Sequence, residues 1–174
     1  MTEANRRELL WQFSFKTYYE CFLEAIVADK LVQRWQWFDR VATTTVAMTA
    51  SGSAISGWAL WNEAAFRPYW AVLAGLGAVL SILHSNLGVA NQLKTWRDLK
   101  STFTLVRIEL ETFRFRMLFQ TDRPVDEHDR EFQELRKRFA EGFSRIDNDI
   151  WRTRGLIRQS QDLLDSRLRE FLVS

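Results

Sequence analysis

The chain has 174 residues, of which 47% are apolar and 14% aromatic, so it can bury a sizeable core and is not mainly disordered. Its seven glycines and two prolines leave few tight turns, which argues against a many-stranded sheet and predicts an all-α protein. The net charge of +2 is too balanced to capture long nucleic acid, and a single cysteine excludes an internal disulfide.

The first segment, residues 1–40, has the pattern of an amphipathic helix. Its apolar residues recur at helical spacing between charged ones: Trp11, Phe15, Tyr18, Phe22, Ala25 and Ile26. Such a helix can lie in a membrane interface or pack on other helices of the chain, and the glutamates in this segment favour packing. No short apolar segment with a small-residue cleavage site opens the chain, so we expect no signal peptide.

Two runs without Asp, Glu, Lys or Arg follow, 41–62 and 68–93, and between them only Glu63 and Arg67 are charged. As helices, each run is about 30 Å long or more, which matches the hydrocarbon core of a bilayer. We therefore predict a two-span membrane hairpin over residues 41–93. The alternative is a buried helical hairpin in a water-soluble core, which the many Thr, Ser and Gly residues of the first run would suit.

Residues at the ends of the two runs support the membrane interpretation. Aromatic side chains suited to the headgroup level flank both runs: Trp35, Trp37, Trp58, Trp61, Tyr69, Trp70 and Trp96. Basic residues lie before the first run and after the second: Lys30, Arg34, Arg40, Lys94, Arg97 and Lys100. This distribution predicts that both termini lie in the cytoplasm.

Each predicted span carries a stripe of small or polar residues. On the first, we expect Thr45, Thr49, Gly52 and Ser56 to pack the hairpin. The second stripe either packs in the same way or lines a water-filled path in an oligomer, and its candidate residues are Gly77, Ser81, His84, Ser85, Gly88, Asn91 and Gln92. Counted from Pro68, His84 lies just past the midplane, where an imidazole needs protein or water around it.

Residues 94–174 predict a cytoplasmic helical domain. A heptad seam that suits a coiled-coil hairpin or an oligomer runs through Trp96, Leu99, Phe103, Val106, Leu110, Phe113 and Met117. After a break at 121–124, a second seam runs through Phe132, Leu135, Phe139, Phe143, Ile146 and Ile150, and a terminal helical segment follows from Leu156.

The sequence contains no pattern typical of an enzyme, a metal site or a cofactor site. We interpret Cys21 as a core thiol, with lipid modification as the alternative, and Asp147 and Asp149 as solvated charges. A nucleotide or phosphate could bind through the basic clusters with their tryptophan, namely Arg114, Arg116, Arg136, Lys137, Arg138, Trp151, Arg152, Arg154 and Arg158.

The order of these parts resembles the SLATT group of bacterial two-transmembrane effectors. The resemblance is carried by Arg34-Trp35-Gln36-Trp37-Phe38-Asp39-Arg40 at the membrane entry, the Ser/Thr/Gly-rich first span, the short turn, and residues 94–100 at the exit. It implies an oligomeric protein of the bacterial inner membrane that forms pores and permeabilises this membrane of an infected cell in antiphage defence. The signal would come from a nucleotide second messenger or an associated sensor protein. The alternative function is a membrane-anchored helical scaffold that does not conduct.

Overall fold

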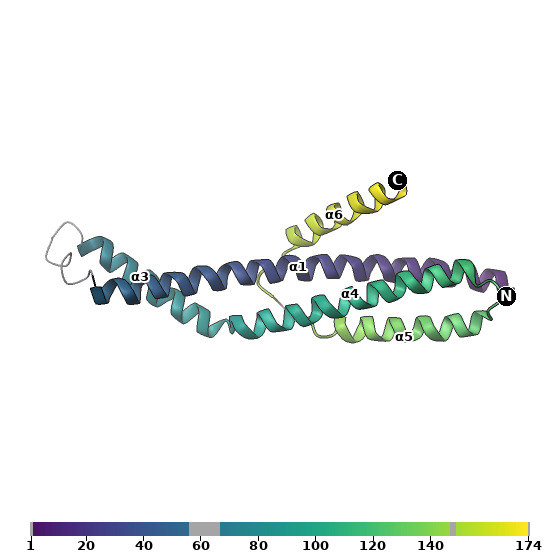
Figure 1. Ribbon diagram of the computed structural model, residues 1–174, viewed down its shortest axis with the longest axis horizontal. Coiled ribbons are helices and arrows are strands. Elements are labelled where there is room, and N and C mark those ends of the chain that lie inside the picture. The colour runs from purple at the N-terminus through teal and green to yellow at the C-terminus, as the bar shows by residue number, and fades with distance from the viewer. Residues whose placement is uncertain (1, 56–66, 147–148, 174) are drawn as a thin grey trace. The chain divides into compact units, whose positions relative to one another are not determined.

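The computed structural model describes residues 2–55, 67–146 and 149–173. In these ranges the chain forms five helices and no strand, so the all-α prediction is confirmed. The helices are α1 (Glu3–Ile55), α3 (Arg67–Asn86), α4 (Val89–Phe119), α5 (Val125–Phe143) and α6 (Arg154–Val173) (Figure 1). None of the described helices is both long and apolar enough to cross a membrane.

Contacts divide the chain into two compact units. Unit 1 contains Met1–Leu31 and Trp96–Ser174, and unit 2 contains Val32–Thr95. Helices α1 and α4 each contribute residues to both units. The sequence had suggested divisions at residues 40 and 93, so the N-terminal segment shares its unit with the C-terminal helices, as expected if it packs on other helices of the chain.

Unit 1 is built from helices that alternate in direction. The rings of Phe113 on α4 and Phe132 on α5 stack with centroids 5.9 Å apart, while Arg138 of α5 binds Glu109 of α4 at 2.7 Å. These pairings run in opposite directions along the two helices, so α4 and α5 form the antiparallel hairpin that the seams predict (Figure 1). Helix α6 is tied to α1 by a 2.8 Å hydrogen bond from the Tyr19 hydroxyl to Asp165.

The core of unit 1 confirms the first predicted seam. All seven of its residues, from Trp96 to Met117, are at most 5% exposed. Residues spaced alternately three and four apart lie on one helical face, and burial of that face fixes which side of α4 meets α1 and α5.

The second seam is buried at Phe132 and Leu135 and half-buried at Phe139, but Phe143 at the end of α5 is 49% exposed. Helix α5 begins after Pro124, and Asp126 and Glu127 in its first turn complement the positive end of the helix dipole. It ends at Phe143, however, so Ile146 and Ile150 lie outside the helix, and Ile150 is exposed. The prediction that the seam continues to Ile150 is therefore wrong.

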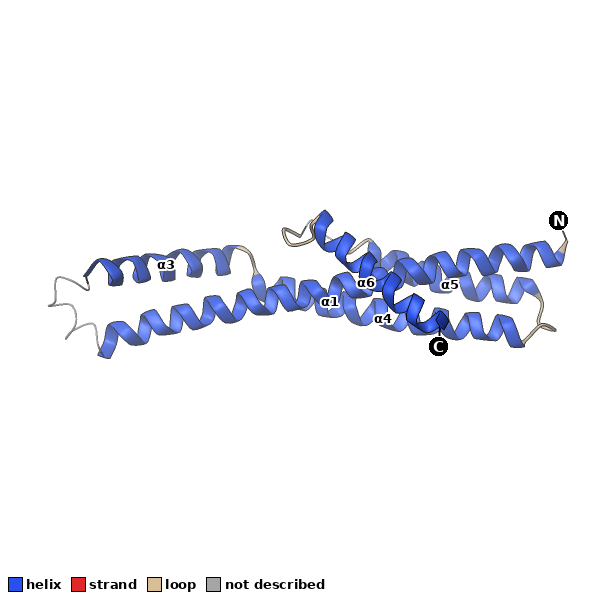
Figure 2. Ribbon diagram, turned by 90° about the horizontal axis from the view of Figure 1, so that it is seen from above, coloured by secondary structure: helices blue, strands red, loops and turns tan. Residues whose placement is uncertain are grey.

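Unit 2 pairs the second part of α1 with α3, which runs back alongside it (Figure 2). The second charge-free run, 68–93, is not one helix, because α3 ends at Asn86 and α4 starts at Val89. Gly88 between them has a φ of 55°, a left-handed conformation that glycine adopts without strain and that commonly ends helices. The prediction of one continuous helix over residues 68–93 is therefore wrong, because the left-handed conformation of Gly88 interrupts the helix.

Candidate functional site

Helices α1 and α3 approach closely where a residue of one predicted stripe, Thr49, meets a residue of the other, Gly77. A Cβ atom added to Gly77 would lie 2.8 Å from the Thr49 Oγ1 and 3.1 Å from its Cγ2, so only glycine fits here at this helix separation. The Thr49 hydroxyl donates within its own helix, to the carbonyl oxygens of Thr45 at 3.0 Å and Val46 at 2.9 Å. At this point α1 and α3 therefore meet by close backbone approach, while the Thr49 hydroxyl bonds within its own helix.

The other residues of the first stripe give less information. Thr45 is half-buried, and Gly52 lies in the described part of α1. Ser56 lies outside the described residues. The packing role predicted for this stripe is therefore seen at Thr49 and stays a prediction at the others.

His84 has a partner that the sequence did not reveal. Its Nε2 lies 2.8 Å from a carboxylate oxygen of Asp39, across the α1–α3 pair. Asp39 comes two residues before the first charge-free run, so His84 is level with the charged end of the helix pair. The antiparallel register, and not the distance from Pro68, therefore sets the level of His84 on the helix pair, and its place relative to a bilayer midplane stays a prediction.

The remaining candidates of the second stripe are less covered. Ser81 and Ser85 are exposed on α3, Gly88 is exposed in the turn, Asn91 is exposed on α4, and Gln92 is half-buried. Large apolar residues are also exposed on α3, between 43% and 62% each: Val72, Leu76, Val79, Ile82 and Leu83. With Gly77 against α1, the described part of α3 presents serines and bulky apolar side chains away from its partner helix.

The basic residues proposed for a phosphate site do not form one cluster: some are paired with carboxylates, and others lie apart from one another. Three are paired with carboxylates: Arg116 with Glu131, Arg138 with Glu109, and Arg152 with Glu24. Arg136, Lys137, Arg154 and Arg158 are exposed, while Trp151 is half-buried. The structure does not gather these residues around one cavity, since three separate cavities of unit 1 each include one arginine of the set: Arg136, Arg114 or Arg138.

Asp149 is not a solvated charge. Its carboxylate accepts a 2.5 Å hydrogen bond from the Trp96 indole Nε1 and a 2.7 Å bond from the backbone N–H of Trp151. The carboxylate thus fastens the α5–α6 connection to the start of α4. Trp96 is 2% exposed, so within the described chain it acts as a core residue and not as part of an aromatic belt. Asp147 lies outside the described residues.

Three further polar groups are buried in unit 1. Burial raises the pKa of the Cys21 thiol to about 12, and its Sγ donates to the Phe103 carbonyl at 3.1 Å, as a core thiol would. Burial also raises the pKa of Glu24, against the opposing effect of Arg152 at 2.7 Å. The imidazole of His128 packs edge-on against Phe113, and burial lowers its pKa.

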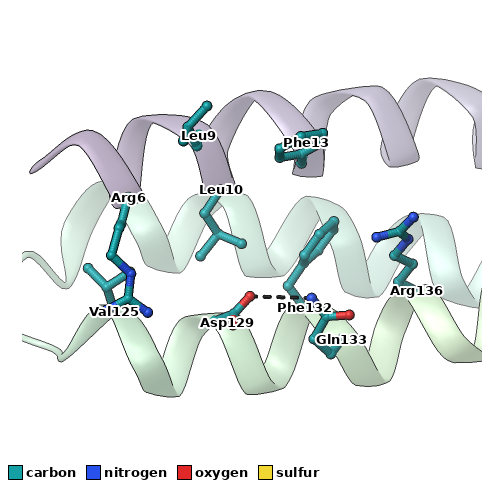
Figure 3. A pocket seen from close by; sticks show the side chains of 9 residues that line it. All are labelled: Arg6, Leu9, Leu10, Phe13, Val125, Asp129, Phe132, Gln133 and Arg136. Atoms are coloured by element: carbon teal, nitrogen blue, oxygen red, sulfur yellow. Dashed lines mark hydrogen bonds between the residues drawn. The ribbon is translucent and has the colours of Figure 1, made fainter. Parts of the chain in front are cut away.

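A groove of about 350 Å³ between α1 and α5 includes Arg136 (Figure 3). Its apolar floor contains Leu10, Val125 and Phe132. Charges of both signs surround this floor: Arg6 is paired with Asp126 at 2.5 Å, and Asp129 lies within the groove, bonded to Gln133. The mixed charges do not select an anion. A smaller cavity beside α5 contains the paired Glu109 and Arg138.

Comparisons with protein-family models, with curated proteins and with solved structures found no match to this chain.

Proposed function

We propose that unit 2 is a membrane-spanning helix pair and that the chain acts as an oligomeric effector that permeabilises the bacterial inner membrane. The observation that carries this proposal is the exposed face of α3, where bulky apolar residues are displayed by a helix that has no charged residue from Pro68 to Asn86. That stretch is about 28 Å long as a helix, close to the thickness of the hydrocarbon core. Lipid would cover the exposed apolar face.

In this proposal, Asp39 and His84 lie at the cytoplasmic boundary of the hydrocarbon core. Both side chains are partly exposed, as expected of a hydrogen-bonded polar pair in the interfacial region. The hydrocarbon core would begin at Val41 on α1 and end near Ser85 on α3, so Ser85 would lie at the cytoplasmic boundary and Ser81 about one turn inside it. Both ends of the chain would then lie on the cytoplasmic side, as the basic residues predict.

Ser81 and Ser85 support an oligomer within the membrane. Both are exposed and lie about one turn apart on α3, on a side that α1 leaves uncovered. A hydroxyl in hydrocarbon needs a protein partner or water, and small residues permit close helix approach. We propose that these serines from several copies face one another and line the conducting path, while Gly77 and His84 hold α3 on α1.

A second exposed stripe favours the same assembly outside the membrane. On α4, the side opposite the buried seam exposes Leu105, Ile108, Phe115 and Phe119 at heptad spacing. Copies anchored in one membrane would meet in parallel, as the strands of a parallel coiled coil do. We propose that a second copy of this chain covers this stripe. The part in antiphage defence rests on the resemblance to the SLATT group, and the trigger would be a nucleotide signal or a partner protein.

Dye-loaded liposomes test the proposal. The reconstituted full chain is expected to release dye, with a rate that rises faster than linearly with the protein-to-lipid ratio. Replacing both Ser81 and Ser85 by leucine should reduce release, because leucine would fill the path and remove the hydroxyls. Ser101→Leu, at an exposed serine of unit 1, is the matched control and should release dye normally.

Three results bear on the details. His84→Ala should still release dye, because His84 lies at the boundary and not in the path. Absence of release at every protein-to-lipid ratio, with and without candidate nucleotides, would contradict a pore. Retention of biological activity after residues 41–93 are exchanged for an unrelated hairpin would support the scaffold function instead.

A further inference from the structure

A second cavity of about 350 Å³ in unit 1 is more apolar than the groove of Figure 3. It lies among α1, α4 and the C-terminal part of α6. Its lining residues are Trp11, Phe15, Tyr18, Glu111, Arg114, Phe115, Leu118 and Leu168. Four of them are aromatic and two are leucines, and the volume falls in the range of small-molecule sites.

Arg114 is the distinctive charged group of this cavity. Its guanidinium carbon lies 3.9 Å from the ring centroid of Trp11 and 4.8 Å from that of Phe15. The side chain is half-buried, and burial lowers its pKa. The ordinary pKa of an arginine is so high that the guanidinium still stays charged at neutral pH. Its one hydrogen bond among the described residues is a 3.5 Å contact to the Trp11 carbonyl.

Among the described residues, five arginines of unit 1 form ion pairs with carboxylates, whereas Arg114 does not. Arg6, Arg116, Arg123, Arg138 and Arg152 all have a carboxylate within ion-pair distance. Over the described part of the chain, no carboxylate lies within 4.0 Å of Arg114. Glu111 lines the same cavity but is exposed to solvent, which screens its charge.

We propose that this cavity binds a ligand with an apolar body and one anionic group, a phosphate or a carboxylate. The apolar body would lie among the aromatic rings and leucines, and the anionic group would accept hydrogen bonds from the Arg114 guanidinium. A half-buried arginine without a carboxylate gains a full ion pair when such a ligand binds. The proposal does not depend on the membrane function of unit 2.

Two probes separate the sources of such a ligand. 1-Naphthyl phosphate represents a soluble aromatic anion and dodecyl phosphate represents a lipid, while 1-naphthol and dodecanol are the neutral counterparts. Titration calorimetry of the full chain in lipid nanodiscs, with empty nanodiscs as the reference, measures binding of each. At least one phosphate is expected to bind about 10-fold or more tightly than its neutral counterpart. The tighter of the two phosphates identifies the source.

Matched variants assign the binding to Arg114. Arg114→Gln should weaken phosphate binding about 10-fold or more, and Arg114→Lys should restore part of it. Arg107→Gln is the control, because Arg107 is on the same helix and stacks on Phe22 at 4.5 Å but does not line the cavity. Leu118→Trp should abolish binding by filling the cavity, with the circular dichroism spectrum verifying the fold. Equal binding of phosphates and alcohols, or equal effects of Arg114→Gln and Arg107→Gln, would overturn the proposal.

Discussion

The contact between Gly77 and Thr49 makes a quantitative prediction for Gly77→Ala. The new methyl group would lie 2.8 Å from the Thr49 Oγ1 and 3.1 Å from its Cγ2, well inside the about 3.5 Å or more of a relaxed carbon contact. Rotating the threonine away would break its hydrogen bonds to Thr45 and Val46, so the helices would have to separate. Overpacking of this kind costs about 1–3 kcal/mol.

Helix propensity acts in the opposite direction, because alanine favours a helix interior by about 1 kcal/mol over glycine. Gly75→Ala is the matched control, since nothing lies within 4 Å of its added Cβ. The propensity gain is common to both variants on α3, so the difference between them isolates the clash. Gly77→Ala should therefore be less stable than Gly75→Ala by about 1–3 kcal/mol.

Hydrogen exchange of the α3 amides, measured by mass spectrometry in detergent micelles, reports this difference locally. Opening of α3 in Gly77→Ala should be about 5- to 150-fold more frequent than in Gly75→Ala. Adding Thr49→Ala removes the two atoms that clash and should restore most of the protection. Equal exchange in the two alanine variants, or no rescue by Thr49→Ala, would refute the register of α1 and α3.

Three further predictions concern unit 1. Trp96→Phe removes the indole donor to Asp149 and should lower stability by about 1–3 kcal/mol, whereas Trp37→Phe at an exposed position should have little effect; thermal melts followed by circular dichroism compare them, and equal melting temperatures would contradict the contact. Cys21, with its pKa raised to about 12, should resist a maleimide at neutral pH until the chain is unfolded, and rapid labelling of the folded chain would contradict its burial. Because burial lowers the pKa of His128, the unfolded chain takes up the proton first as the pH falls below about 6.5, so the melting temperature should decline there; His128→Leu should show a smaller decline, and identical declines would exclude this residue.

The sequence predicted those parts of the fold that depend on one helix face alone. The seam from Trp96 to Met117 could be read directly, because alternating steps of three and four leave only one side of α4 to bury. The same reasoning failed after Phe143, since spacing alone did not show where the helix ends. The helix end at Asn86 had a signal in the glycine two residues later, which the uninterrupted apolar run concealed.

Pairings between helices were beyond the reach of these patterns. Asp39 and His84 are 45 positions apart, and neither helix alone reveals the register that brings them together. The cavity around Arg114 has the same origin. Its aromatic residues were recognised as an apolar stripe and its arginine as part of a basic cluster, but only the packing of α1 on α4 shows that Arg114 stacks on Trp11. The basic residues near Arg152 in the sequence likewise did not show that Arg152 is paired with Glu24 on α1.

A spin label at Val79 is the sharpest test of whether the exposed apolar face of α3 contacts lipid. Val79→Cys is labelled in the full chain, where the native Cys21 is buried, and collisions with oxygen and with a water-soluble nickel chelate are measured in bilayers. If this face contacts lipid, the label at position 79 should collide often with oxygen and rarely with the nickel chelate. A label at Ser101→Cys in unit 1 should collide rarely with oxygen and often with the nickel chelate. Frequent collisions with nickel at position 79 would contradict lipid contact.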